Sequence, residues 1–382
     1  MMAKPVILHF GWGCDSASIL IEWLTNPTRR DFELENLVVL AAQTGNESQL
    51  IKQQNEQHIF PVLRKNHIRT VQVAKSGNFL ADGYEVLDDS RSPTTCFIEG
   101  SFTLAQELLT AGTVPSYANK RRRCSSKFKG TVLDAWVRDE FGTTPIQSVY
   151  GYNADEQYRV DRALAYIKDN ETLSYPLLQW NWNRSKTESY MAAFAGERFY
   201  RSACIMCPFS GISGTRQEIM TKYRLHPEEG GLAAFIEFVS ICLNPRQTLY
   251  TKSRTVPDLL QEDNNHAALE NLNERLRATD WSLYRVRRIY SSRVPFRSVQ
   301  KLHTGSRENC QVELAKLEDQ HNLPLVTETG ISRLYLERRG DDGRDCEEMY
   351  VVAPATVQSK ERKSFEKRWA EAHQLTLDLG FK

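Results

Sequence analysis

The sequence predicts an α/β protein in which the first 210 residues or so form a domain around a parallel β-sheet. Two observations predict this class. Short apolar runs alternate with segments of helical spacing, and the first apolar run leads directly into a glycine-rich turn. Strands that alternate with helices build a parallel sheet with right-handed crossovers. From about residue 215 the pattern changes, and longer helices followed by strand-like runs predict a mixed α+β C-terminal extension.

The expected elements of the first domain follow in order along the chain. Residues 5–10 (PVILHF) form a buried strand, and residues 16–24 have the apolar spacing of a helix. A strand, a helix and three more strands are then expected at residues 34–42, 48–65, 68–74, 146–152 and near 173–178. The sequence therefore predicts a first domain at residues 1–215.

The extension at residues 216–382 has a different pattern. Residues 226–243 have the spacing of an apolar helix, and residues 264–281 that of a polar helix. The tail from Thr304 onward alternates short strand-like runs with charged helical sequence. This part of the chain is expected to serve as a surface for a partner or for nucleic acid.

Composition excludes several classes of protein. The 382 residues include 41% apolar and 25% charged residues, as in an ordinary globular protein, and no apolar run is long enough for a membrane span. The N-terminus has no signal peptide pattern. Lys and Arg total 49 against 48 for Asp and Glu, which excludes a globally basic nucleic-acid binder but allows local basic patches. Eight unevenly spaced cysteines indicate a reducing, cytoplasmic location rather than a disulfide scaffold.

The turn after the first expected strand is the most informative local feature. It contains Gly11, Trp12, Gly13, Cys14, Asp15 and Ser16. A glycine-rich turn from strand to helix presents backbone N–H groups and the positive end of a helix, which together hold a phosphate group. The short side chains of Asp15 and Ser16 can cap the helix or bind a ligand. The alternative is a capped α/β turn that binds nothing. The Walker-type lysine is missing.

This turn resembles the SGGxDS motif of the PP-loop ATP pyrophosphatases, with Gly11 in place of the leading Ser and Trp12 in place of a small residue. Further segments match, in order, the phosphoadenosine-phosphosulfate-reductase-like branch of that superfamily. They are Gln43–Glu47 (like DTG-x-E), Arg122–Lys129 (like R-x-C-T/C…K), Gly151–Glu156 with Arg159, Tyr175–Trp180 and Cys204–Phe209. The resemblance covers residues 5–210 and implies an adenine-nucleotide alpha-hydrolase-like (PP-loop) fold.

The resemblance implies that ATP is cleaved to AMP and pyrophosphate to activate a substrate. Asp15, which would help to bind Mg²⁺, and Lys127 are then the expected catalytic residues. Lys129 and Arg121–Arg123 could also neutralise developing charge. The expected ATP contacts are Gly11, Trp12, Gly13, Cys14, Asp15, Ser16, Thr44, Gly45, Arg123, Gly151 and Glu156.

In the same branch, cysteines at the positions of Cys124, Cys204 and Cys207 bind an iron–sulfur cluster or take part in sulfur chemistry. Three thiolates suit a [4Fe–4S] cluster with one open iron. A structural zinc ion, a redox thiol pair and free thiols remain alternatives. The chain lacks the E-C-G-[LI]-H motif of sulfonucleotide reductases, and so resembles relatives that thiolate nucleic acid, such as those of DNA phosphorothioation. A sulfur-donor protein is an expected partner.

A basic and aromatic segment at Trp281–Lys301 offers a candidate nucleic-acid surface. It contains five arginines, one lysine and four aromatic residues, and no acidic residue. Arginines bind phosphates and aromatic rings stack on bases, whereas the alternative is a pair of strands with one basic face. Two other functions stay open for the whole chain: reduction of a sulfonucleotide, and nucleotide binding without catalysis.

Overall fold

A computed structural model of the chain describes residues 4–115, 123–163, 167–210, 216–290 and 296–379. The chain divides into two compact units, Met1–Ala105 with Ser116–Ser210, and Gln106–Pro115 with Gly211–Lys382. The sequence predicts a boundary after residue 215. It does not predict that Gln106–Pro115, inside the first half of the chain, belongs to the second unit.

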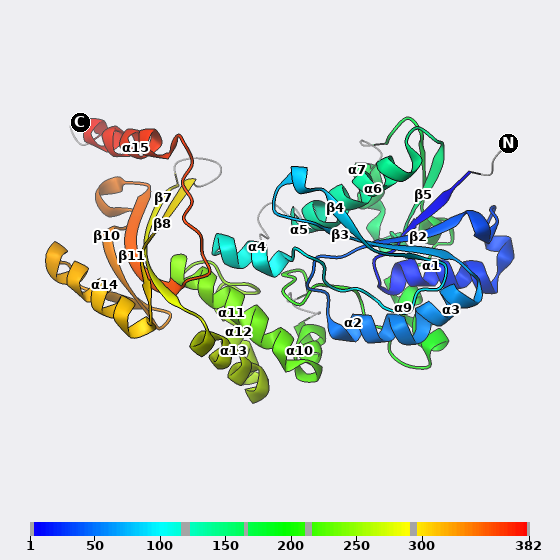
Figure 1. The fold of residues 1–382 in the computed structure, drawn as a ribbon, viewed down its shortest axis with the longest axis horizontal. Coiled ribbons are helices and arrows are strands. Elements are labelled where there is room, and N and C mark those ends of the chain that lie inside the picture. Colours follow the sequence, from blue (N-terminus) through cyan, green and yellow to red (C-terminus); the bar gives the residue numbers. More distant parts are fainter. Residues whose placement is uncertain (1–3, 116–122, 164–166, 211–215, 291–295, 380–382) are drawn as a thin grey trace. The chain divides into compact units, whose positions relative to one another are not determined.

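The first unit contains a six-stranded sheet with the order β4-β3-β2-β1-β5-β6 (Figure 1). All neighbouring strands are parallel except β3 and β4, which are antiparallel. The fold is therefore α/β with a mostly parallel, Rossmann-like sheet, as expected. The strands are β1 (Val6–His9), β2 (Leu37–Ala42), β3 (Arg69–Lys75), β4 (Tyr84–Ser90), β5 (Ile146–Tyr150) and β6 (Glu171–Ser174).

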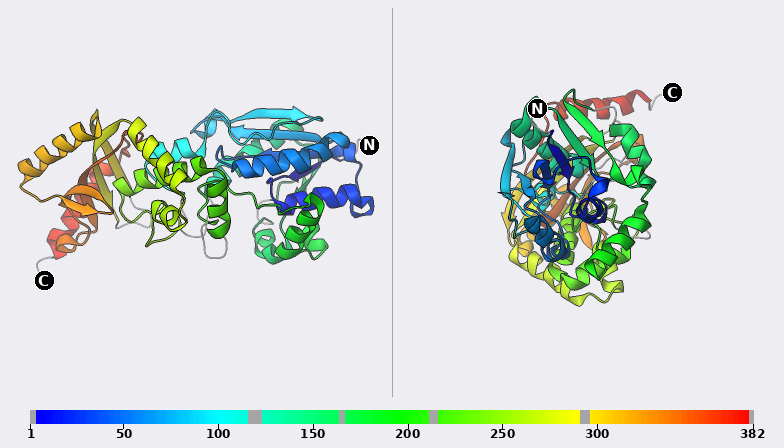
Figure 2. Two further views of the ribbon diagram at one scale, coloured as in Figure 1. Left: turned by 90° about the horizontal axis from the view of Figure 1, so that it is seen from below. Right: turned by 90° about the vertical axis from the view of Figure 1, so that its right-hand side faces the viewer.

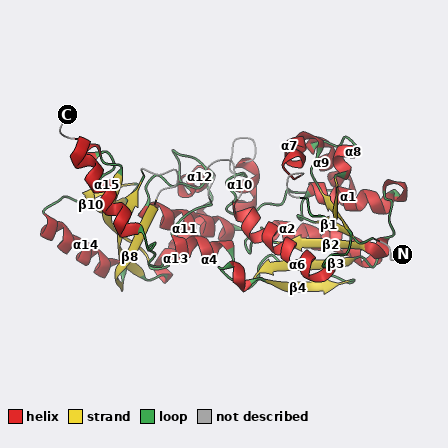
Figure 3. Ribbon diagram, turned by 90° about the horizontal axis from the view of Figure 1, so that it is seen from above, coloured by secondary structure: helices red, strands yellow, loops and turns green. Residues whose placement is uncertain are grey.

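Helices cover both faces of this sheet (Figures 1 and 3). Alternate residues of β1 show why: Val6 and Leu8 join one apolar cluster with α1 and α3, whereas Ile7 joins a second cluster with α6. The helices of this unit are α1 (Cys14–Thr25), α2 (Gln49–Gln54), α3 (Phe60–Lys65), α5 (Arg123–Ser125), α6 (Thr131–Phe141), α7 (Gln157–Ala163), α8 (Pro176–Gln179) and α9 (Arg184–Ala195), and α4 (Leu104–Ala111) continues into the second unit. Short 3-10 turns lie at Pro27–Arg29, Leu34–Asn36, Leu80–Asp82 and Ala154–Glu156.

Two π-helical turns interrupt the helices of the first unit. The first, at Asn55–Ile59, divides the helix expected at 48–65 into α2 and α3. The second, at Ser126–Gly130, joins α5 to α6 and carries Lys127 and Lys129. Such turns occur frequently at functional sites because they change the direction in which side chains point.

The second unit contains an antiparallel five-stranded sheet with the order β8-β7-β11-β10-β9. Helix α14 packs across this sheet, and α11 lies on the opposite side (Figure 2). The strands are β7 (Trp281–Ile289), β8 (Phe296–Gly305), β9 (Val326–Glu328), β10 (Ile331–Glu337) and β11 (Cys346–Pro354). The helices are α10 (Arg216–Leu225), α11 (Pro227–Leu243), α12 (Val256–Glu262), α13 (His266–Ala278), α14 (Arg307–His321) and α15 (Phe365–Leu379), with a 3-10 turn at Asp341–Gly343.

Candidate functional site

The candidate site lies where the strand order of the first sheet reverses. Strand β1 pairs with β2 on one side and with β5 on the other, and all three are parallel. The turns that follow β1 and β5 therefore leave the same edge of the sheet and face each other there. In open α/β sheets, this switch point beyond the carboxyl ends of the strands is where ligands bind.

Glycines allow the two turns to pack closely around the start of α1. A Cβ atom on Gly151 would lie 2.9 Å from the backbone nitrogen of Ser16, and one on Gly13 would lie 3.0 Å from the backbone nitrogen of Ser202. The N–H of Gly11 donates to Oγ of Ser16 at 3.2 Å. Gly13 is the N-cap of α1 and has no side chain that could cap it. The positive end of α1 therefore lies at the centre of the glycine-rich turn.

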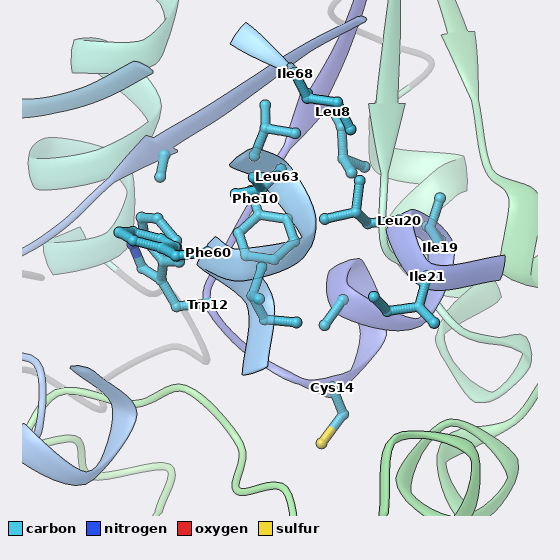
Figure 4. Packing of buried hydrophobic residues seen from close by; sticks show 14 of the residues in the cluster. Leu8, Phe10, Trp12, Cys14, Ile19, Leu20, Ile21, Phe60, Leu63 and Ile68 are labelled. Carbon is cyan, nitrogen blue, oxygen red and sulfur yellow. The ribbon is translucent and has the colours of Figure 1, made fainter. Parts of the chain in front are cut away.

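Two residues of the turn, Trp12 and Cys14, have buried side chains (Figure 4). Trp12 is buried, and its ring packs against Phe10 and Phe60 with centroids 5.1 and 5.5 Å apart. Its φ of 61° is uncommon for a bulky residue. Cys14 is also buried, and its thiol donates to the carbonyl of Phe199 at 3.1 Å. The side chains of these two predicted ATP contacts are therefore part of the core, and their carbonyls accept from Asn55 and Ser18.

The carboxylate of Asp15 is held by residues that the sequence analysis did not select. Its Oδ2 accepts from Arg184 at 2.5 Å and its Oδ1 from the hydroxyl of Thr187 at 2.9 Å, both from the first turn of α9. The amide of Asn153 lies 3.5 Å from both oxygens. Burial raises the pKa of Asp15, and the charge of Arg184 opposes this effect.

Glu156 extends the same network on the β5 side of the site. Its Oε1 accepts from Arg159 at 3.0 Å and lies 3.9 Å from Arg184, so Arg184 lies between two carboxylates. The guanidinium of Arg159 stacks over the ring of Tyr152 at 4.1 Å. Arg184 and Thr187 were missed because α9 follows β6 about 170 residues after Asp15, and no local pattern marks the contact.

A second cluster forms around the turn after β2. Gly45 has a φ of 80°, and a Cβ there would lie 2.6 Å from the side chain of Thr103. The hydroxyl of Thr44 donates to Glu47 at 3.4 Å. The backbone of Glu47 forms an antiparallel bridge with that of Cys204. The N–H of Ile205 donates to the carbonyl of Asn46, the residue before Glu47, at 2.9 Å. The turn after β2 is thus joined directly to the Cys-x-x-Cys segment.

Lys129 connects this cluster to the π-helical turn. Its ammonium group lies 2.7 Å from Oε1 of Glu47, whose side chain is 1% exposed. Burial acts to lower the pKa of this lysine, but the charge of Glu47, its hydrogen bond with Glu47 and the neighbouring thiol groups together raise it. Lys129 was noted in the sequence but not selected as a site residue. The structure places it, rather than Lys127, beside the thiols.

The three selected cysteines are close enough to influence one another's ionisation. A hydrogen bond from the Cys204 thiol lowers the pKa of Cys207 to about 6. Burial acts in the opposite direction, whereas the backbone N–H groups of Phe209 and Ser210 lower the pKa further. The pKa of Cys204 is correspondingly raised. Burial, and then the charge on Cys207, raises the pKa of Cys124. Cys207 is therefore the thiolate of the set at neutral pH.

For the other predicted cations the structure gives the following positions. Lys127 donates to Asn78 at 3.1 Å, and Arg123 is exposed at the start of α5. Arg121 and Arg122 lie outside the described residues.

The structure corrects the prediction that Trp281–Lys301 forms a nucleic-acid surface. Its described arginines are held by acidic and carbonyl groups of the same unit: Arg285 by Glu348 at 2.5 Å, Arg288 by Glu347 at 2.8 Å, Arg287 by Glu361 and Glu366, and Arg297 by the carbonyls of Ala111 and Gly112. These arginines tie β7 and β8 to their neighbours. The described part of Trp281–Lys301 therefore does not present the arginine-rich phosphate-binding surface that its composition predicted.

No family model matches this chain, and neither does any curated protein or solved structure with which it was compared. The fold and the site define its class by geometry: a doubly wound α/β protein with a glycine-lined turn at the switch point of its sheet. None of the helices in the described ranges is long and apolar enough to cross a membrane.

Proposed function

We propose that the chain is an ATP pyrophosphatase of the PP-loop type, which activates an acceptor for sulfur transfer in the cytoplasm. The observation that carries the proposal is the glycine-lined turn of Gly11–Ser16, which surrounds the positive end of α1 at the switch point. Such a turn suits the β- and γ-phosphates of ATP, because backbone N–H groups and the helix dipole both favour anions there.

The side chains around the turn suit the chemistry at the α-phosphate. An oxygen of the acceptor attacks the α-phosphorus, the bond to the bridging oxygen of the β-phosphate breaks, and pyrophosphate leaves. Arg184, 2.5 Å from Asp15, is the cation best placed to stabilise the charge that develops on the phosphates. When Mg²⁺·ATP binds, Asp15 would exchange this arginine for the metal ion, which prefers carboxylate oxygens.

The thiol cluster supports sulfur transfer as the second step. The adenylated acceptor carries AMP as its leaving group: a sulfur nucleophile attacks the acceptor atom bonded to the adenylated oxygen, that bond breaks, and AMP leaves with the oxygen. The hydrogen bond from Cys204 lowers the pKa of Cys207, which favours the nucleophilic thiolate form of Cys207. Cys124, Cys204 and Cys207 would supply the thiolate ligands of an iron–sulfur cluster, which would offer an open iron to an external sulfur. Nucleic acid is the proposed acceptor, and a sulfur-donor protein the proposed source of sulfur.

Titration calorimetry of the anaerobically purified protein with Mg²⁺·ATP, together with an assay of pyrophosphate release, tests this function. We expect binding and slow pyrophosphate release, with loss of release in Asp15→Asn. A Ser189→Ala variant, at an exposed position of α9, serves as the control. The proposal fails if neither wild type nor control binds ATP.

One observation favours a second candidate, nucleotide binding without catalysis. Asp15 already has a full set of partners in Arg184, Thr187 and Asn153. If this set persists with the nucleotide bound, the carboxylate does not reach Mg²⁺. Tight ATP binding without pyrophosphate release, with and without single-stranded nucleic acid, would decide for this candidate.

A further inference from the structure

We propose that the second unit binds a zinc-class divalent metal ion through Glu337, Cys346 and His373. Their ligand atoms, a carboxylate oxygen, Sγ and a ring nitrogen, all lie within 4.8 Å of one another. Tetrahedral zinc with bonds of about 2.0–2.3 Å places its ligand atoms about 3.3–3.7 Å apart, so only a small adjustment is needed. This site lies outside the ATP and thiol clusters and does not depend on the function proposed for them.

The hydrogen bonds of His373 are those of a metal-ligating histidine. Its Nδ1 lies 2.8 Å from the carbonyl oxygen of Trp369, one turn earlier on α15, and must donate a proton to it. Its Nε2 lies 2.9 Å from Oε2 of Glu337. In the neutral imidazole this nitrogen is an acceptor, so two acceptors would face each other. A cation shared by Nε2 and the carboxylate removes the conflict, and a backbone carbonyl on Nδ1 is the usual outer partner of a metal-bound histidine.

Cys346 supplies the donor that selects for a transition metal. It is the first residue of β11 and is fully buried. A metal ion that binds it displaces its proton. Sulfur, imidazole and carboxylate together suit zinc, whereas Mg²⁺ and Ca²⁺ prefer oxygen ligands alone.

The charges and the surroundings also fit a divalent ion. A thiolate and a carboxylate together balance the two charges of the ion. Arg344 lies 3.3 Å from Oε1 of Glu337, which leaves Oε2, the oxygen beside His373, for the metal. The side chain of His373 is 31% exposed, so an ion can enter from solvent and keep a water molecule as its fourth ligand.

The metal ion would link α15 to strands β10 and β11 of the sheet. Glu337 ends β10 and Cys346 begins β11, whereas His373 comes from α15. The buried ring of Phe365 and the ion pair of Arg287 with Glu366 also hold α15 to its unit. The competing explanation is an ion pair between Glu337 and a doubly protonated His373, in which Cys346 takes no part. The two explanations differ in whether zinc binds.

Metal titration of the full chain decides between them. Zinc affinity is measured by competition with a chromogenic chelator, and Co²⁺ serves as a spectroscopic probe, because a thiolate ligand gives an intense near-ultraviolet band. We expect His373→Gln to weaken one equivalent of zinc by at least about 100-fold, the upper end of what loss of an outer-shell partner costs. His303→Gln, at an exposed position of β8, should leave every equivalent unchanged.

Cys346→Ser should remove the Co²⁺–thiolate band of that same equivalent, whereas Cys310→Ser, at another buried cysteine of the unit, should keep it. Any metal bound by Cys204 and Cys207 forms a separate equivalent that none of these variants touches. Circular dichroism of the metal-free variants shows that they fold, and the half-exposed position of His373 makes its variant the safer test. Equal zinc affinity in His373→Gln and His303→Gln, or no zinc binding by the wild type, would overturn the proposal and leave an ion pair.

Discussion

Gly151 offers the sharpest test of how the switch-point turn is built. It follows β5, and a Cβ atom at this position would lie 2.9 Å from the backbone nitrogen of Ser16 and 3.2 Å from its Cα. Ordinary contacts of a Cβ begin at 3.4 Å, so Gly151→Ala must displace the first turn of α1 by about 0.5 Å. Overpacking of this kind costs about 1–3 kcal/mol. For a domain of this size the melting temperature should fall by about 2–12 °C.

The same displacement should weaken ATP binding, because the N–H groups at the start of α1 move away from the phosphates. A hydrogen bond to a charged group contributes about 1.5–3 kcal/mol, so loss of one raises the Kd about 10- to 100-fold. Scanning calorimetry gives the melting temperature, and titration with Mg²⁺·ATP gives the Kd. The matched control is Gly130→Ala, since a Cβ at Gly130 meets nothing within 4 Å and its φ is negative.

Gly130→Ala should leave both quantities unchanged or raise the melting temperature slightly. Unchanged melting and unchanged ATP affinity in Gly151→Ala would refute the reasoning that this glycine is needed for the close approach of the two turns. Lower stability with normal ATP affinity would separate the two claims: the packing argument would hold, and the phosphate position would be wrong.

Three further predictions concern ionisable groups of the first unit. Alkylation of Cys207 by iodoacetamide should reach half its maximal rate near pH 6. Mass spectrometry of the labelled peptide measures this rate, and a midpoint at the ordinary thiol pKa of about 8.5 would contradict the prediction. Arg184→Met removes the cation that opposes the burial of Asp15, so the folded-state pKa of this carboxyl rises further above its unfolded value. The variant's loss of melting temperature should therefore be large at pH 7 and fade as the pH falls below the unfolded pKa of about 4; an equal loss at both pH values counts against the pairing. Lys129→Met leaves the carboxylate of Glu47 buried and unpaired, which should cost about 3–5 kcal/mol in urea unfolding, and adding Glu47→Gln should recover much of it; no recovery would show that the two groups are not coupled.

The parallel strands were predictable because burial on both faces leaves a simple pattern. β1 and β2 are mostly apolar runs, and such runs are typical of strands covered by helices on both sides, whereas β3 is recognisable by its β-branched residues Thr70, Val71 and Val73. β4, at Tyr84–Ser90, was not predicted. It carries three acidic residues in seven, and its position at the edge of the sheet leaves it partly exposed, so its sequence resembles that of a loop.

The arginines of β7 show where composition misleads. The segment contains no acidic residue, so it resembles a basic surface when viewed alone. The acids that neutralise it, Glu347 and Glu348, lie about 60 residues later on β11, and antiparallel pairing places them opposite Arg288 and Arg287. Buried arginines of this kind are recognisable only once the register of the two strands is known. The same limit applies to Arg184, which reaches Asp15 from a distant helix.

The two clusters of the first unit are linked by one short segment. The carbonyl of Phe199 accepts from the thiol of Cys14, Ser202 packs against Gly13, and the backbone of Cys204 pairs with that of Glu47. The phosphate turn and the Cys-x-x-Cys pair, both found by resemblance, lie nearly 190 residues apart in the sequence. In the folded unit, the phosphate turn contacts one end of a nine-residue stretch that follows α9, and the Cys-x-x-Cys pair forms the other end. This stretch crosses the carboxyl edge of the sheet. The phosphate turn and the Cys-x-x-Cys pair therefore belong to one unit, which is the physical reason to propose ATP cleavage and sulfur chemistry as two steps of one reaction.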